Sequence, residues 1–115
     1  MEKFMLLFRG GDTHIHNAKD SKETMEYIQS WTTWMQGLGQ QGKLTGGDPL
    51  KTTGKQVIGK NKIVTEGPYM EANVMVGGYL LVNAKDMEEA VEISKGCPIF
   101  LENGTVEIRP IQQQN

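Results

Sequence analysis

Two short apolar segments constrain the fold of this chain more than any other feature. Residues 4–8 (Phe-Met-Leu-Leu-Phe) and 79–82 (Tyr-Leu-Leu-Val) are too short for a helix, and they are apolar at successive positions. This pattern is typical of a β-strand that is buried on both faces. A segment with helical spacing follows each of them, so the sequence predicts two strand–helix–strand halves.

Both predicted helices begin with a capping pair. The two pairs are Asp20 with Glu23 and Asp86 with Glu89. At this spacing the aspartate side chain accepts a hydrogen bond from an amide of the first helical turn, and the glutamate side chain reaches back to the aspartate backbone amide. The first helix has an apolar face at intervals of three and four, made of Met25, Ile28, Trp31, Met35 and Leu38. The predicted inner face of the second helix comprises Met87, Ala90, Val91 and Ser94, and Gly96 and Pro98 end it.

The remaining strands are more polar. Residues 43–45 predict a strand that Gly46-Gly47-Asp48-Pro49 stops, and residues 105–109 alternate between polar side chains and Val106 or Ile108. Residues 57–58 and 63–65 predict a hairpin around residues 59–62. The glycine pairs of the chain match no phosphate-binding loop and are interpreted as turns or bulges.

This order predicts an α+β, ferredoxin-like fold, in which two helices cover one face of an antiparallel sheet. The two apolar strands occupy the centre of such a sheet, and their second face stays uncovered. A second copy of the chain packed sheet against sheet would cover it, so we expect a homodimer that forms a dimeric α/β barrel.

Composition narrows the class of protein further. The 115 residues (12.8 kDa) suffice for a single domain over residues 1–115, and one cysteine excludes an intrachain disulfide. A net charge of −2 and lysines without interleaved aromatics argue against nucleic-acid binding. No apolar run approaches the ~20 residues of a membrane span, and no signal-peptide pattern occurs, so we expect a cytoplasmic protein.

Two histidines lie in the polar segment after the first strand. His14 and His16 have a spacing that suits a metal site, but a third ligand would have to be a carboxylate such as Asp12 or Asp48. The alternatives are a solvated loop, which we favour, or acid–base work by one imidazole. We therefore predict no metal and no cofactor.

The stretch Glu66-Gly67-Pro68-Tyr69-Met70-Glu71 is the most unusual in the chain. Its Gly-Pro bend can direct Glu66, Tyr69 and Glu71 toward one place, where a carboxylate and a phenol would serve as base and donor. From spacing alone a strand-ending turn with surface acids is the simpler interpretation. Trp31 and Met35 are core residues or the wall of an apolar pocket, and Cys97, after the negative end of a helix, is a buried structural residue.

The chain resembles the YCII-related family, in its DGPF branch. The resemblance depends on Glu66-Gly67-Pro68-Tyr69, on Gly77-Gly78-Tyr79-Leu80-Leu81, on Cys97-Pro98 and on residues 104–110, and it extends to residues 5–7 and 42–47. It implies a ferredoxin-like dimeric barrel with a cleft in each subunit. Some relatives are lyase-like enzymes on chlorinated aromatics, for which a histidine with an acidic partner has been proposed as the catalytic pair.

This sequence departs from that family at two positions. The branch motif Asp-Gly-Pro-Phe is Glu66-Gly67-Pro68-Tyr69 here, and Trp31 stands where the other branch has its helix histidine. Tryptophan cannot act as a base, so the catalytic pair does not carry over and a different reaction, or none, is implied.

Two functional hypotheses follow. The first is a small-molecule enzyme or ligand-binding protein with a pocket between the first helix, the sheet and the bend at residues 66–71. In this hypothesis Glu66 is the candidate for acid–base catalysis, and His14 is a second catalytic candidate, supplied by a loop. The candidates for substrate binding are Arg9, Trp31, Met35, Tyr69 and Glu71. The second is a non-catalytic partner or regulatory module, which the absence of the helix histidine motivates. The resemblance implies an association with extracytoplasmic-function sigma factors for such a module.

Overall fold

A computed structural model describes residues 1–10, 21–71 and 74–113 of the chain. In chain order the elements are β1 (Glu2–Arg9), α2 (Ser21–Gln40), β2 (Leu44–Pro49), β3 (Lys55–Ile58), β4 (Ile63–Glu66), β5 (Val76–Ala84), α3 (Met87–Lys95), the 3-10 helix η1 (Pro98–Glu102) and β6 (Thr105–Pro110). Apart from η1, all of these elements are predicted from the sequence.

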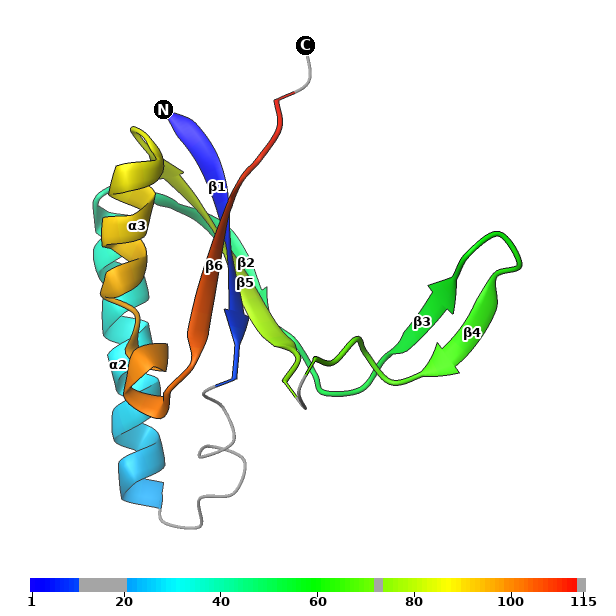
Figure 1. Ribbon diagram of the computed structural model, residues 1–115. Coiled ribbons are helices and arrows are strands. Elements are labelled where there is room, and N and C mark those ends of the chain that lie inside the picture. Colours follow the sequence, from blue (N-terminus) through cyan, green and yellow to red (C-terminus); the bar gives the residue numbers. More distant parts are fainter. Residues whose placement is uncertain (11–20, 72–73, 114–115) are drawn as a thin grey trace.

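The main sheet is antiparallel, with the strand order β2-β5-β1-β6. Both helices lie on one of its faces (Figure 1). This confirms the predicted ferredoxin-like α+β fold, with the two apolar strands β1 and β5 at the centre. The other face of the sheet, which we call the open face, carries no helix.

The core lies between the sheet and the helices. Phe4, Leu6 and Val82 are fully buried, and they alternate along β1 and β5 with half-buried residues that point to the open face. Each large buried side chain of this kind contributes roughly 1.5–3 kcal/mol. The helices contribute Leu38, Ala90 and Ile93 to the same cluster. Val106 and Ile108 of β6 pack against it, as their alternation predicts.

Helix α2 presents the predicted face to the core only in part. Trp31, Met35 and Leu38 pack in or against the core as predicted, and Tyr27 and Trp34 join them, whereas Met25 and Ile28 are 65% and 49% exposed. The core-facing stripe therefore follows the aromatic residues, since large rings fill the space above the sheet. The capping residue predicted for this helix, Asp20, lies outside the described residues.

Helix α3 begins as predicted. The Asp86 carboxylate accepts a hydrogen bond from the Glu89 amide (2.9 Å), and Gly96 ends the helix. Its inner face differs in part, because Ile93 is buried with Ala90 and Ser94, whereas Met87 is 41% exposed.

Strand β2 extends further than predicted. Residues 46–49 do not stop it but pair with β5 as far as Pro49↔Gly78. A register shift between Leu44 and Gly46 marks a bulge at Thr45, directly before the glycine pair, and both glycines are paired with β5. Pro49 is tolerated because β2 is an edge strand, where the missing donor faces no partner.

The predicted hairpin is present and stands apart from the main sheet. β3 and β4 pair from Lys55↔Glu66 to Ile58↔Ile63. We call residues 55–66 the hairpin arm. It projects away from the domain on the side of the sheet opposite the helices (Figure 1).

Candidate functional site

A cavity of about 490 Å³ lies between the middle of α2 and one end of the sheet. Its size is in the range of small-molecule sites, which span roughly 300–1,000 Å³. Most of its wall is apolar, from side chains of α2, β1, β5 and η1: Phe8, Tyr27, Ile28, Trp31, Met35, Leu80 and Ile99.

Glycine creates the space for this cavity. In the pairing of β2 with β5, Gly47 is opposite Leu80 and Gly78 is opposite Pro49, and Gly78 lies on the core-facing side of β5 together with Leu80. Both glycines line the cavity, so the sheet presents backbone instead of side chains there. Gly47 has a φ of +149°, and a Cβ at that position would overlap the Leu80 side chain and the Tyr79 carbonyl. Position 47 therefore has a structural need for glycine.

The aromatic wall is held by edge-to-face contacts. The rings of Phe8 and Trp31 lie 5.1 Å apart between centroids at an interplanar angle of 85°, and Tyr27 lies 6.4 Å from Trp31. Trp34 does not line the cavity but belongs to the same aromatic cluster, with its ring centroid 5.8 Å from that of Trp31 and 6.3 Å from that of Phe8. Such pairs fix ring orientation, so the wall is formed before any ligand binds.

Polar groups are few at the cavity. Thr32 lines it, and its hydroxyl donates to the Ile28 carbonyl at 3.1 Å. Asp48 is the single carboxylate residue among the described residues that line the cavity. The Tyr79 hydroxyl donates to Asp48 Oδ2 at 3.0 Å, and this hydrogen bond to a carboxylate raises the pKa of Tyr79, with a further contribution from the Asp48 charge. Tyr79 therefore stays protonated at neutral pH. Tyr79 alternates with the core-facing residues of β5 and is paired with Asp48, so the phenol and the carboxylate lie on the open face, away from the helix side of the sheet.

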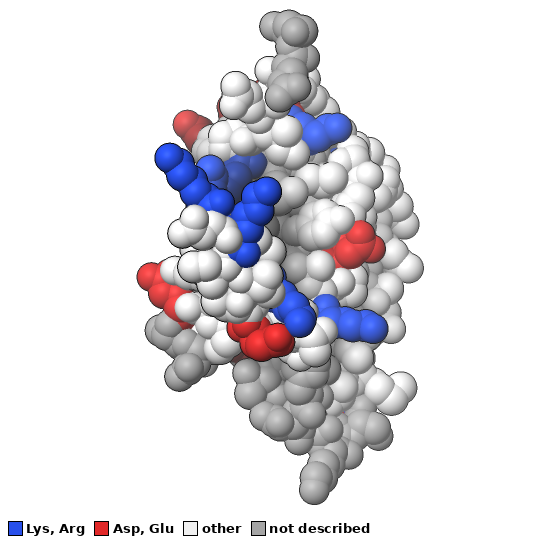
Figure 2. Space-filling model, turned by 90° about the vertical axis from the view of Figure 1, so that its right-hand side faces the viewer, with Lys and Arg blue, Asp and Glu red and all other residues white. Residues whose placement is uncertain are grey.

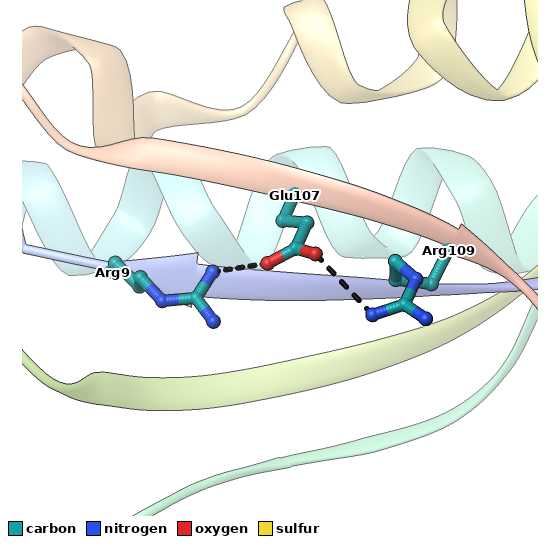
Figure 3. Close-up of polar contacts among 3 residues, drawn as sticks. All are labelled: Arg9, Glu107 and Arg109. Carbon is teal, nitrogen blue, oxygen red and sulfur yellow. Dashed lines mark hydrogen bonds and ion pairs between the residues drawn. The ribbon is translucent and has the colours of Figure 1, made fainter. Parts of the chain in front are cut away.

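The open face carries a second polar cluster. Glu107 Oε1 lies 2.6 Å from Arg9 Nη1, and its other oxygen lies 3.5 Å from Arg109 Nη1 (Figure 3). The hydrogen bond from Arg9 is the main cause that lowers the pKa of Glu107 below its ordinary value. Met5 and Leu7, opposite Arg109 and Glu107, lie beside this cluster on the same face.

The structure brings only some of the predicted site residues together. Trp31 and Met35 line the cavity. Arg9 does not line it, because the strand alternation directs its side chain to the open face, where it binds Glu107.

The residues of the Gly-Pro bend also lie apart from the cavity lining. Glu66 is on the hairpin arm, 82% exposed, with its carboxylate 3.0 Å from Lys55 Nζ. Tyr69 is 67% exposed, and Glu71 is exposed in a short bridge with Val74. Their roles as site residues stay predictions, and His14 and His16 lie outside the described residues.

Two further observations concern metal and membrane binding. In residues 1–10, 21–71 and 74–113, no group of three or more His, Cys, Asp and Glu side chains is placed to hold a metal ion. No helix in these same ranges has the length and apolarity that crossing a bilayer requires.

Comparison with known proteins agrees with this architecture. The sequence profile of the YCII-related domain matches residues 3–115. The chain belongs to the YCII-related family. A solved structure similar to this YCII-related chain is 5-chloro-2-hydroxyhydroquinone dehydrochlorinase from Burkholderia phenoliruptrix AC1100, in complex with 2,5-dihydroxybenzoquinone. The two share a TM-score of 0.60 at 10% identity, over 97% of this chain and 95% of the other. None of the curated protein sequences matches significantly.

Sequence reasoning missed several lining residues of this YCII-related domain. Phe8 and Leu80 were assigned to strands without a site role, and Tyr27 lies off the predicted helix face. The available signal was the pair of glycines at Gly46-Gly47 and again at Gly77-Gly78, because glycine in a strand marks a bulge or a close backbone approach. Two such pairs on neighbouring strands indicate a place where side chains are missing from the sheet.

Proposed function

We propose that this YCII-related protein binds a planar, mainly apolar small molecule in the cavity beneath α2. The observation that carries the proposal is the combination of a preformed aromatic wall with a glycine floor. Trp31 offers a ring face or edge against which a flat ligand can stack, and Gly47 and Gly78 leave room for it against the sheet.

The chemistry of the lining favours an aromatic ligand with hydroxyl or carbonyl substituents. The backbone of Gly47, Gly77 and Gly78 lines the floor, where carbonyl oxygens can accept from hydroxyl substituents. The dehydrochlorinase of similar fold binds 2,5-dihydroxybenzoquinone, which is a compound of this class. We infer the same ligand class here.

We also propose that a second copy of the chain covers the open face. Leu7, Tyr79, Met5 and Leu81 form its half-buried centre, and no element of the described chain lies over them. The arrangement of Glu107 between two arginines suits a two-fold interface, where each Arg109 can meet the partner's Glu107.

Ligand binding is tested with 2,5-dihydroxybenzoquinone as the probe. Trp31 lines the cavity and Trp34 does not, so in W34F the remaining indole reports on the site. We expect saturable quenching of W34F fluorescence beyond the quenching of free N-acetyltryptophanamide. Isothermal titration calorimetry of the unaltered chain gives the affinity independently of light absorption by the quinone.

Two neighbouring threonines of α2 provide a matched pair of variants. Thr32 lines the cavity, whereas Thr33 lies on the outer groove between α2 and α3. T32F is expected to fill the cavity and to weaken binding at least about tenfold, whereas T33F keeps it. Equal affinity in both variants, or no saturable binding of hydroxylated quinones and phenols by the unaltered chain, contradicts the proposal.

A further inference from the structure

The hairpin arm carries apolar side chains that nothing covers within the described chain. Val57, Ile58, Ile63 and Val64 are 49–65% exposed. Val57 is paired with Val64, and Ile58 with Ile63. Directly paired residues share a face and successive residues alternate, so each face of the arm presents one aliphatic pair.

An arm of this kind is not stable by its own pairing. An isolated two-stranded hairpin is marginal in water, and three or more strands or packing against another element are needed for stability. The arm also exposes backbone groups along both outer edges, which are templates for association. Its β-branched residues therefore indicate a surface that is covered in the working form of the protein.

The position of the arm restricts what can cover it. The arm rises on the same side as the open face of the sheet (Figure 1), so a body that sits on the open face also meets the arm. Figure 2 views the molecule from this side and shows lysine and arginine side chains with acidic side chains among them. Within the arm, lysines outnumber acidic residues, so a partner that covers it needs an apolar patch together with negative charge.

A second copy of the chain meets these needs. The arm contains Lys55, Lys60 and Lys62 against Glu66, a net charge of +2, so the rest of a chain that carries −2 as a whole has −4. Helix α3 carries part of this acidic surface, with Glu88, Glu89 and Glu92 against Lys95. Because α3 lies on the side of the sheet opposite the open face, an exchanged arm has to reach around the edge of the partner's sheet to meet it. A basic arm that projects away from its own acidic body can reach the body of another copy, and the charges then attract.

We propose that the hairpin arm clasps the body of a second copy of the chain, with the arms exchanged between the two subunits. The inference rests on the dimer proposed above and extends it, because the arm then supplies part of the association energy. It also gives a reason for the four β-branched residues of the arm, which are exposed in a single subunit.

The test is the dimer dissociation constant, measured by sedimentation or light scattering over a dilution series. V57T/V64T and I58T/I63T each remove the apolar pair from one face of the arm, and threonine keeps the β-branching that suits a strand. We expect at least one of the two variants to weaken the dimer about tenfold or more. M25T/L101T is the matched control, since it replaces two residues that are 65% and 74% exposed outside the arm, and it should leave the dimer unchanged.

The outcomes distinguish the proposed exchange of arms from the proposed sheet-to-sheet dimer. A native chain that is monomeric at tens of micromolar contradicts both proposals. A dimer that neither arm variant weakens overturns the clasp and leaves the sheet-to-sheet dimer standing. As a second readout, lysine-reactive cross-linking of mixed ¹⁴N and ¹⁵N chains should join Lys60 or Lys62 of one chain to the other, and cross-links confined to single chains would count against exchange.

Discussion

The Phe8 ring contacts the Trp31 indole edge-to-face, with centroids 5.1 Å apart, and so joins the central strand β1 to helix α2 at the wall of the cavity. Phe8 is 6% exposed and belongs to the main core, whereas Trp31 is only partly buried. One aromatic pair thus connects the stability of the fold to the shape of the site.

This contact predicts a measurable coupling between the two residues. F8L and W31L are each expected to destabilise the domain, and the double-mutant cycle should give a coupling of roughly 0.5–1.5 kcal/mol, the usual value for an aromatic pair beyond its buried area. Urea unfolding at pH 7 measures the four free energies of unfolding. Strict additivity would mean that the two rings do not interact in solution.

Substitution of glycine by alanine is expected to have opposite effects on stability at positions 47 and 37. G47A puts a methyl group into the Leu80 side chain and the Tyr79 carbonyl, so a loss of about 1–3 kcal/mol in stability is expected. G37A is the control, because a Cβ there meets nothing within 4 Å inside α2. It should stabilise by roughly 0.5–1 kcal/mol, since alanine favours a helix over glycine.

The Arg9–Glu107 pair predicts an acid-dependent contribution to stability. The pKa of Glu107 is lowered in the folded chain, so the charged carboxylate stabilises the fold above its unfolded pKa, near 4.5. This contribution decreases as the pH falls from that value through the lower folded pKa. The difference in unfolding free energy between the native chain and E107Q should therefore shrink below pH 4.5.

A control for this pH dependence is available on α3. Glu92 pairs with Lys95 at 3.0 Å, but both side chains are at least 64% exposed, so water screens the pair. E92Q is expected to show a much smaller change with pH. If E107Q and E92Q give the same pH profile, the pair on the open face has no special role.

Cys97 predicts an unreactive thiol. It is 3% exposed, and burial raises its pKa to about 12, so almost no thiolate exists at neutral pH. Ellman's reagent at pH 7.5 should label the native chain slowly and the urea-unfolded chain at the rate of a free thiol. Rapid labelling of the folded protein would show that this region opens.

Much of the fold was predictable from local pattern. Segments that are apolar on both faces predicted that β1 and β5 lie at the centre of the sheet, and the Asp86–Glu89 pair predicted where α3 begins. These signals are local, because a strand buried on both faces and a helix cap each depend on a few neighbouring residues. The structure therefore confirms the topology with small shifts in the element ends.

The site was less predictable because it arises from contacts between distant segments. Trp31 and Met35 were identified from the helix face, but Phe8, Ile99 and Gly47 meet them only after the sheet has formed. The bend at residues 66–71 attracted attention as a local motif, yet it leads to the projecting arm and not to the cavity lining. Sequence spacing also could not indicate that Tyr27 is buried in place of Met25.

The most direct test of the account is a ¹H–¹⁵N NMR titration of the unaltered chain with 2,5-dihydroxybenzoquinone. We predict saturable shifts of the Trp31 indole and of the Gly47, Gly77 and Gly78 amides, with the amides of the hairpin arm, such as Val57, unmoved. Saturable shifts that map to the arm or to the open face, or no saturable shifts with any planar hydroxylated aromatic, would contradict the assignment of the cavity as the ligand site.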